Sequence, residues 1–153
     1  MKKVSVVIPM YYEQEVAEVC YKRVKKVLDE LKEKYEHEII FINDGSKDKT
    51  LDILQDIAKV DKNVKIISFS RNFGHQAAVT AGLKYVTGDA IIIIDADLQD
   101  PPELIPDMIE KWEQGYEVIY GKRKKRNGES AFKLLTAKAF YTTLNKLSDV
   151  DIP

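Results

Sequence analysis

Short runs of β-branched residues alternate with longer segments in which apolar residues recur every three or four positions. The strand-like runs are 4–8, 39–42, 64–69, 90–94 and 117–120, and the segments of helical period are about 15–34, 49–60, 76–86, 101–114 and 130–147. Pro9 is expected to end the first strand. This strict alternation predicts an α/β fold, with a mostly parallel sheet and helices on both of its faces. At 153 residues, we expect one domain covering 1–153.

The run 90–94 is apolar without interruption, which predicts a strand in the middle of the sheet, buried on both faces. In parallel sheets, ligands bind beyond the carboxyl ends of the strands. Compact polar residues follow each predicted strand and are expected to meet at one edge, namely 11–13, 43–46, 71–72, 95–97 and 121–123.

Asp95 and Asp97 follow the most hydrophobic of these strands. Alternate residues of an extended segment point the same way, so both carboxylates can face one ligand. Two carboxylates suit Mg²⁺ or Mn²⁺ shared with a substrate diphosphate, and they suit a helix cap equally well. Gln99 and Asp100, with the helix start at 101–102 behind them, favour the metal site.

The segment 43–46 consists of Asn, Asp, Gly and Ser, which taken alone favour a turn. Between a strand and a helix, Asp44 could instead accept hydrogen bonds from a nucleotide base or ribose. Ser46 and Asp48 are both candidate N-caps of the helix that follows.

Arg71 follows the third predicted strand and could pair with a phosphate or with a carboxylate such as Asp95. His75 begins a helix with no second histidine nearby, so we expect a solvated surface residue. Gly74 and Gly82 are expected to mark close approaches of backbones.

Charge and cysteine content exclude several classes of function. The net charge of −1 hides one basic cluster, 122–126, which the predicted last helix continues with Lys133 and Lys138. We expect an anion site there and no nucleic-acid binding, because no interleaved aromatic residues extend the cluster. Cys20 is the single cysteine and is expected to be an inert buried thiol. The absence of a signal peptide and of a membrane-spanning run predicts a soluble, cytoplasmic chain.

Together these motifs resemble the family 2 glycosyltransferases, which have the Rossmann-like GT-A fold. The segments that carry the resemblance are 6–13, 43–48, 70–74, 81–83, 88–90 and 95–103. The sequence Asp-Leu-Gln-Asp-Pro-Pro-Glu, followed by Tyr-Gly-Lys-Arg at 120–123, is similar to the branch that glycosylates polyprenyl phosphates. That branch contains the dolichol-phosphate mannosyltransferases and the bactoprenol glucosyltransferases.

The resemblance implies a role for each matching residue. Pro9, Tyr11 and Glu13 would line the nucleotide pocket, Asp44 would contact the base, and Asp95 would lie near the ribose and diphosphate. Asp97 and Gln99 would hold the metal. Arg123, with Lys133 and Lys138, would bind the acceptor phosphate, and Arg71 would bind the donor.

The sequence departs from the family at three positions. The family commonly has asparagine at Tyr12, usually aspartate at Asn43, and often serine at or near Ala137. It also continues beyond Pro153 into a further segment, an interfacial helix and usually membrane helices. We therefore expect the chain to be the donor-binding half of a longer protein that works at the cytoplasmic face of a membrane.

The expected reaction is a single inverting displacement at the anomeric carbon of a nucleotide-sugar, most simply a UDP-sugar. A phosphate acceptor needs no general base, because its second pKa is about 6, whereas a saccharide hydroxyl acceptor would need one. Two further alternatives stay open: a phosphatase with Asp-x-Asp after an apolar strand, and a nucleotide-binding module without activity. The sequence leaves homo-oligomer formation open.

Overall fold

The computed structural model describes residues 1–99, 101–123 and 130–135, with only the backbone described in the last two strands. The chain divides into two compact units, Met1–Glu103 and Leu104–Pro153. The expected single domain over 1–153 stays a prediction.

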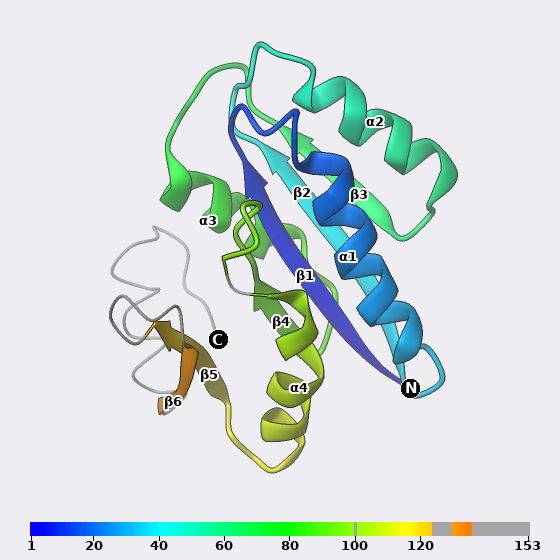
Figure 1. Ribbon diagram of the computed structural model, residues 1–153, viewed down its shortest axis with the longest axis vertical. Coiled ribbons are helices and arrows are strands. Elements are labelled where there is room, and N and C mark those ends of the chain that lie inside the picture. The colour runs from blue at the N-terminus through cyan, green and yellow to red at the C-terminus, as the bar shows by residue number, and fades with distance from the viewer. Residues whose placement is uncertain (100, 124–129, 136–153) are drawn as a thin grey trace. The chain divides into compact units, whose positions relative to one another are not determined.

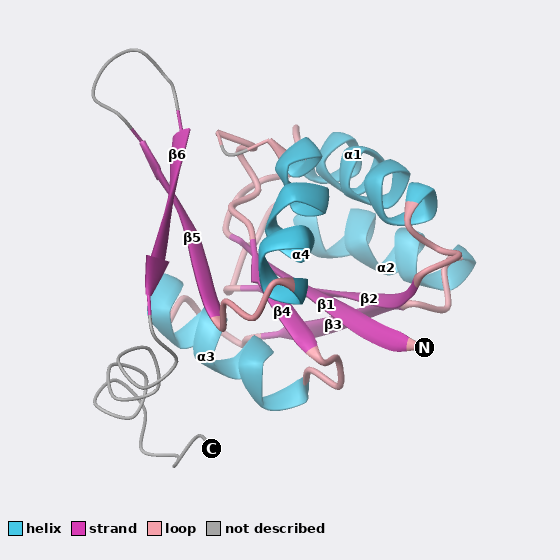
Figure 2. Cartoon of the chain, turned by 90° about the horizontal axis from the view of Figure 1, so that it is seen from below, coloured by secondary structure: helices cyan, strands magenta, loops and turns pink. Residues whose placement is uncertain are grey.

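The first unit is a parallel sheet covered by helices on both faces, as the alternating pattern predicts. Its strands have the order β3-β2-β1-β4. Their bounds are Lys2–Met10 for β1, Tyr35–Asn43 for β2, Val64–Ser68 for β3 and Ala90–Ile93 for β4. The helices are α1 (Ala17–Glu30), α2 (Thr50–Val60) and α3 (His75–Tyr85). Helices α1 and α2 lie on one face of the sheet and α3 on the other (Figures 1 and 2).

The two central strands form the core, and every residue from Val4 to Met10 and from His37 to Asn43 is buried. Such continuous burial is typical of parallel strands covered on both faces. Helix α3 packs tightly on this core, because a side-chain carbon on Gly82 would lie 2.6 Å from Val7 Cγ1. A close approach does occur at Gly82, but to side chains of the sheet and not to the backbone that was expected. Burial raises the pKa of the Cys20 thiol to about 12, as expected of an inert buried residue.

Strand β4 corrects one expectation. It pairs within the first unit with β1 alone, so it is an edge strand of this sheet. Ile92 is buried, but Ile91 and Ile93 are 46% and 42% exposed. The prediction of burial on both faces was wrong, because an apolar run does not say which neighbours a strand acquires.

Pro9 does not end β1, which continues to Met10 and keeps its parallel register with β2 through Pro9↔Ile42. Val7 accepts a hydrogen bond from Ile94 on the β4 side, and Met10 accepts one from Asp44 on the β2 side. Because strand residues alternate, the nitrogen of Pro9 faces the β4 side beyond the last paired residue, Ile93. Its missing N–H therefore costs no ladder hydrogen bond.

A buried carboxylate holds the opposite, amino-terminal edge of the sheet. Glu38 accepts hydrogen bonds from Ser5 Oγ (2.6 Å), Lys65 Nζ (2.8 Å) and the Thr87 backbone N–H (2.6 Å). Burial opposes ionisation of Glu38, but these hydrogen bonds outweigh it and lower its pKa to about 2. The network joins three strands to the loop between α3 and β4.

The second unit contains helix α4 (Ile105–Glu113) and an antiparallel pair, β5 (Val118–Arg123) and β6 (Ser130–Leu135). A short 3-10 turn, Pro102–Leu104, precedes α4, so the helix begins later than expected.

The helix predicted over 130–147 was wrong for 130–135, which pair as a strand with β5. A short apolar run can form a helix or a strand, and here pairing with β5, which begins with β-branched residues, favours the strand. Lys122 and Arg123 of the basic cluster lie in β5, which continues beyond the strand expected at 117–120. The remainder of the cluster, 124–126, and residues 136–147 lie outside the described residues.

Candidate functional site

A pocket of about 620 Å³ lies at the carboxyl end of the parallel sheet. This volume is typical of sites for small ligands and cofactors. Residues at or beyond the carboxyl ends of all four strands line it: Pro9, Met10, Tyr11 and Glu13 from the first, Asp44 from the second, Asn72, Gly74 and His75 from the third, and Asp95, Ala96 and Asp97 from the fourth. Six of the residues expected at the site therefore meet there: Pro9, Tyr11, Glu13, Asp44, Asp95 and Asp97.

The loop after β1 is fixed by the loop after β2. The Tyr12 N–H donates to Ser46 Oγ at 2.8 Å, and the Glu13 N–H donates to Thr50 Oγ1 at 3.0 Å. The Glu13 carbonyl accepts from the first turn of α1, at Val16 and Ala17. Glu13 thus has its backbone held on two sides while its side chain faces the pocket.

Tyr12 has a φ of 52°, in the left-handed region that side chains rarely adopt. Asparagine tolerates this conformation better than tyrosine does. The geometry therefore gives a physical reason for the asparagine common at this position in the family that the sequence resembles. The Tyr12 ring packs edge-on against Tyr11, with centroids 4.6 Å apart.

Asp44 is buried and holds the loop after β3. Its Oδ1 accepts from the Phe73 N–H at 2.8 Å, and its Oδ2 accepts from the Gly74 N–H at 3.1 Å and from Asn72 Nδ2 at 3.0 Å. Gly45, at φ 76°, lies so close to this loop that an added Cβ would be 2.2 Å from the Arg71 carbonyl carbon. The segment 43–46 is a turn, as its composition favours, and it also organises its neighbour.

The side chains of the helix-start candidates have different partners. Asp48 Oδ1 accepts a hydrogen bond from the Thr50 N–H at 3.0 Å, so Asp48 satisfies the backbone N–H of the first residue of α2. Ser46 instead accepts from Tyr12. A Cβ added to Gly74 would meet nothing within 4 Å, and the φ of 102° is what requires glycine there. The expected close approach at Gly74 was therefore wrong.

His75 contacts Asp95, with 3.1 Å between Nε2 and Oδ1. The side chain is 63% exposed, as expected of a solvated surface residue, and it also has a partner, Asp95, that was not expected. The signal available in the sequence was its place in the segment that follows the third strand, at the edge where Asp95 also lies. Arg71, the other residue considered as a partner of Asp95, instead lies over the Phe73 ring, with its Cζ 4.2 Å from the ring centroid. The side chain that contacts Asp95 is therefore His75.

The segment after β4 makes a tight turn closed by the Leu98 N–H and the Asp95 carbonyl, 3.1 Å apart. Leu98 has a left-handed φ of 57°. The Gln99 N–H donates to Asp97 Oδ1 at 3.2 Å. Beyond the turn, Glu103 forms an ion pair with Arg23 of α1. Strained non-glycine residues cluster at functional sites, and here Tyr12 and Leu98 flank one pocket.

Negative charge gathers in this pocket. Burial raises the pKa of Glu13, and the neighbouring charges of Asp97 and Asp48 raise it further. Asp95 and Asp97 are both exposed on the pocket side of a buried Ala96. The arrangement suits a ligand that brings positive charge, such as a cation bound together with a phosphate group.

A sequence profile described as glycosyl transferase family 2 matches residues 5–151. The chain belongs to this family. It is 56% identical over 149 residues to the uncharacterized glycosyltransferase YkcC of Bacillus subtilis, covering 97% of this chain and 46% of YkcC. It is 48% identical over 146 residues to the bactoprenol glucosyl transferase of Shigella phage SfX, covering 95% and 47%. The chain thus spans about half the length of these relatives.

The fold agrees with this membership. The structure of the mannosyltransferase PcManGT from Pyrobaculum calidifontis, in complex with GDP-Man and Mn²⁺, superposes with a TM-score of 0.66. The two sequences are 21% identical, and the superposition covers 83% of this chain and 37% of the PcManGT chain. The predicted GT-A fold is confirmed. No helix in the described part of the chain is both long and apolar enough to cross a membrane.

As a family 2 glycosyltransferase, the chain is expected to use a divalent metal. Among residues 1–99, 101–123 and 130–135, no three His, Cys, Asp or Glu side chains are grouped as metal ligands. The carboxylates of Asp97, Asp95 and Glu13 nevertheless face one pocket and are the oxygen donors that Mg²⁺ and Mn²⁺ prefer. Gln99 is exposed and lies two residues beyond Asp97. These side chains are of the chemical kind that a divalent metal binds, and the metal itself stays a prediction.

The residues expected to bind the acceptor phosphate lie in the second unit. Arg123 pairs with Ser130 at one end of the β5–β6 ladder, and Lys133 pairs with Tyr120. Lys138 lies outside the described residues. The assignment of these three residues stays a prediction.

Proposed function

We propose that this chain is the donor-binding half of an inverting glycosyltransferase that moves a sugar from a nucleotide-sugar to a polyprenyl phosphate. The observation that carries the proposal is the convergence of four strand-end segments on one acidic pocket, which Asp95 and Asp97 help to line. The bactoprenol glucosyl transferase among the relatives supports the lipid-phosphate acceptor.

The donor would enter the pocket with its nucleotide against the loop after β1. Pro9 and Tyr11 line this side, and the Tyr11 ring is half-exposed and available for contact with a base. Asp44 keeps acceptor capacity on Oδ1, which receives one hydrogen bond, so it can still accept from a base N–H. Arg71, exposed on the same loop as Asn72, is assigned to the donor phosphates.

The donor diphosphate would lie near Asp95, and Asp97 with Gln99 would hold Mg²⁺ or Mn²⁺. When bound, the metal supplies Lewis-acid stabilisation of the leaving diphosphate. Asp95, Asp97 and Glu13 repel a diphosphate by themselves, so the protein's own charges make donor binding depend on the cation.

In the reaction, a phosphate oxygen of the acceptor attacks the anomeric carbon as the bond to the diphosphate oxygen breaks. The nucleoside diphosphate leaves with the bonding electron pair, and the anomeric configuration inverts. The acceptor is already largely dianionic near neutral pH, so no protein base is needed. Arg123, Lys133 and Lys138 would offset the repulsion between acceptor and donor.

The test is calorimetric binding of UDP-glucose and GDP-mannose to the chain with and without Mn²⁺. We expect Mn²⁺-dependent binding of a UDP-sugar that Asp97→Asn weakens by at least about tenfold, because a metal ligand is lost. The exposed Asp56→Asn in α2 is the matched control and should bind as the wild type does.

The outcomes separate the alternatives. Equal affinity of Asp97→Asn and wild type would remove the metal role. A transfer assay would use a short-chain polyprenyl phosphate and would add the remaining half of a relative's chain. Binding of UDP without sugar transfer in that assay would favour a nucleotide-binding module. Hydrolysis of an aryl phosphate would favour the phosphatase alternative.

A further inference from the structure

The four loops around the pocket are joined in series by hydrogen bonds. The loop after β1 is held by Ser46 and Thr50, and the loop after β3 is held by Asp44. One contact, between His75 and Asp95, joins the loop after β3 to the loop after β4. The first link thus joins the segments after β1 and β2, and the second joins those after β2 and β3. The contact between His75 and Asp95 is the third link.

This third link is not a contact between neighbouring strands. In the order β3-β2-β1-β4, strands β3 and β4 are the two edges of the sheet, with β2 and β1 between them (Figure 1). His75 is the first residue of α3, which lies on the face opposite α1 and α2 (Figure 2) and packs on the central strands β1 and β2. The contact therefore joins the segments that follow the two edge strands, and it involves the carboxylate expected at the donor diphosphate.

The position of His75 is set by Asp44. The Asp44 carboxylate holds the two N–H groups of Phe73 and Gly74 that directly precede the helix. Gly74, at φ 102°, makes the turn that starts α3 at His75. A buried carboxylate with three donors in hydrogen-bond contact fixes a loop firmly, because such charge-assisted bonds are the strong ones.

We propose that His75 is a positioning residue of the donor site, which orients the Asp95 carboxylate through its Nε2 and is itself placed by Asp44 through the loop 72–74. This inference rests on the proposed function for its ligand. Asp44 would then have two roles: the expected contact with the nucleotide base, and the placement of the His75 side chain.

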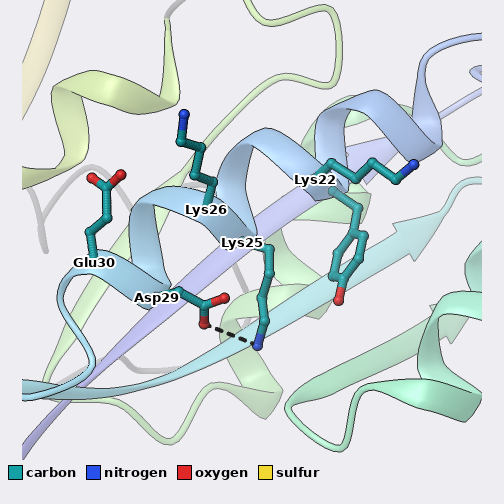
Figure 3. A pocket seen from close by; sticks show the side chains of 6 residues that line it. Lys22, Lys25, Lys26, Asp29 and Glu30 are labelled. Atoms are coloured by element: carbon teal, nitrogen blue, oxygen red, sulfur yellow. Dashed lines mark ion pairs between the residues drawn. The ribbon is translucent and has the colours of Figure 1, made fainter.

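The second hollow of the first unit gives no comparable site. It lies along α1 and is lined by Tyr21, Lys22, Lys25, Lys26, Asp29 and Glu30 (Figure 3). Lys25 pairs there with Asp29 and Asp61, and Lys22 pairs with Glu18 along the helix. The His75–Asp95 pair is different because it joins two loops at the site of expected chemistry.

The experiment compares His75→Gln with His75→Met. The glutamine amide keeps an N–H donor at a reach similar to Nε2, whereas methionine has a similar size and no donor. We expect His75→Met to weaken binding of UDP with Mn²⁺ by about tenfold, the usual effect of losing the partner of a ligand-holding carboxylate. His75→Gln should restore affinity to within about threefold of the wild type. The neighbouring exposed Gln76→Met is the matched control and should bind normally.

A second measurement needs no ligand. In the ligand-free chain, the ring-nitrogen resonances of His75 should move when Asp95→Asn removes the carboxylate charge. They should move also in Asp44→Asn, while amide exchange at Phe73 and Gly74 becomes faster. A thermal melt of each variant checks that the fold persists.

Wild-type affinity in His75→Met, or equal losses in His75→Gln and His75→Met, would overturn the inference. Unmoved ring signals in Asp95→Asn would overturn it as well. If the wild type binds neither UDP nor GDP with Mn²⁺, the proposed function fails, and the ring signals alone then decide the role of His75.

Discussion

At the scale of single residues, the site depends on backbone conformations that most side chains avoid. Tyr12 and Leu98 adopt left-handed φ angles of 52° and 57° on two of the loops that form the pocket. Such residues cost about 1–2 kcal/mol each. Surrounding hydrogen bonds hold them, as Ser46 does for Tyr12. The pocket is thus built with strain that the rest of the unit offsets.

Gly45 gives a sharp test of this packing. In Gly45→Ala, the new carbon would lie 2.2 Å from the Arg71 carbonyl carbon and 2.4 Å from the Asn72 nitrogen, at a φ of 76°. Because both neighbours are backbone atoms, we expect a loss of roughly 3 kcal/mol or more in the free energy of unfolding, measured by denaturant titration.

Gly115→Ala is the matched control for Gly45→Ala. Gly115 has a similar left-handed φ of 103°, but nothing lies within 4 Å of the added carbon. Only the conformational cost of about 1 kcal/mol remains. Equal losses in the two variants would contradict the close packing of the loops after β2 and β3.

At the scale of elements, the helix–strand alternation was predictable because it depends on local periodicity. The first four strands and first three helices occur where the pattern places them, with bounds shifted by a few residues. Strand β6 was missed because its six residues become a strand only through pairing with β5. The exposed face of β4 was missed for the related reason that a run of isoleucines does not specify its neighbours.

The Glu38 network predicts how pH acts on the joint between the sheet and the α3–β4 loop. The pKa of Glu38 is lowered from 4.5 to about 2 in the folded chain. Its stabilising contribution, of the order of 3 kcal/mol, is therefore complete above pH 4.5 and is lost as the pH falls toward 2. We expect the free energy of unfolding, measured by denaturant titration at several pH values, to fall through this window.

Glu38→Gln should lower stability at pH 7 and flatten the pH dependence between 4.5 and 2. Its amide cannot accept all the hydrogen bonds that Ser5, Lys65 and Thr87 donate. The matched control is Glu18→Gln, because Glu18 is exposed and its partner among the described residues is Lys22, one turn along α1. A pH profile of Glu38→Gln identical to that of the wild type would show that another carboxylate carries the acid sensitivity.

At the scale of the whole molecule, the residues assigned to the donor and those assigned to the acceptor belong to different units. The pocket lies entirely within Met1–Glu103, whereas Arg123 and Lys133 lie in Leu104–Pro153. The first unit therefore contains all the loops expected to bind the nucleotide. Donor binding is the property that this chain is expected to show by itself.

Ligand and metal removal test that expectation. A UDP-sugar and Mn²⁺ at about a hundredfold excess over the dissociation constant should stabilise the chain by about 3 kcal/mol, seen as a raised melting temperature. A chelator should remove the effect, since the acidic pocket repels the diphosphate when no cation is present. A shift that persists in the chelator would contradict a metal role while leaving nucleotide binding intact.

The sequence by itself determined the α/β class, the strand-end placement of Asp44, Asp95 and Asp97, and the family. Periodicity and motif spacing are local properties, so they can be read from the amino-acid sequence alone. Only the tertiary structure decided that β4 is an edge of the sheet, that Asp44 holds the loop after β3, and that His75 reaches Asp95. These features join residues 20 or more positions apart, and their geometry arises from packing and pairing that no local pattern specifies.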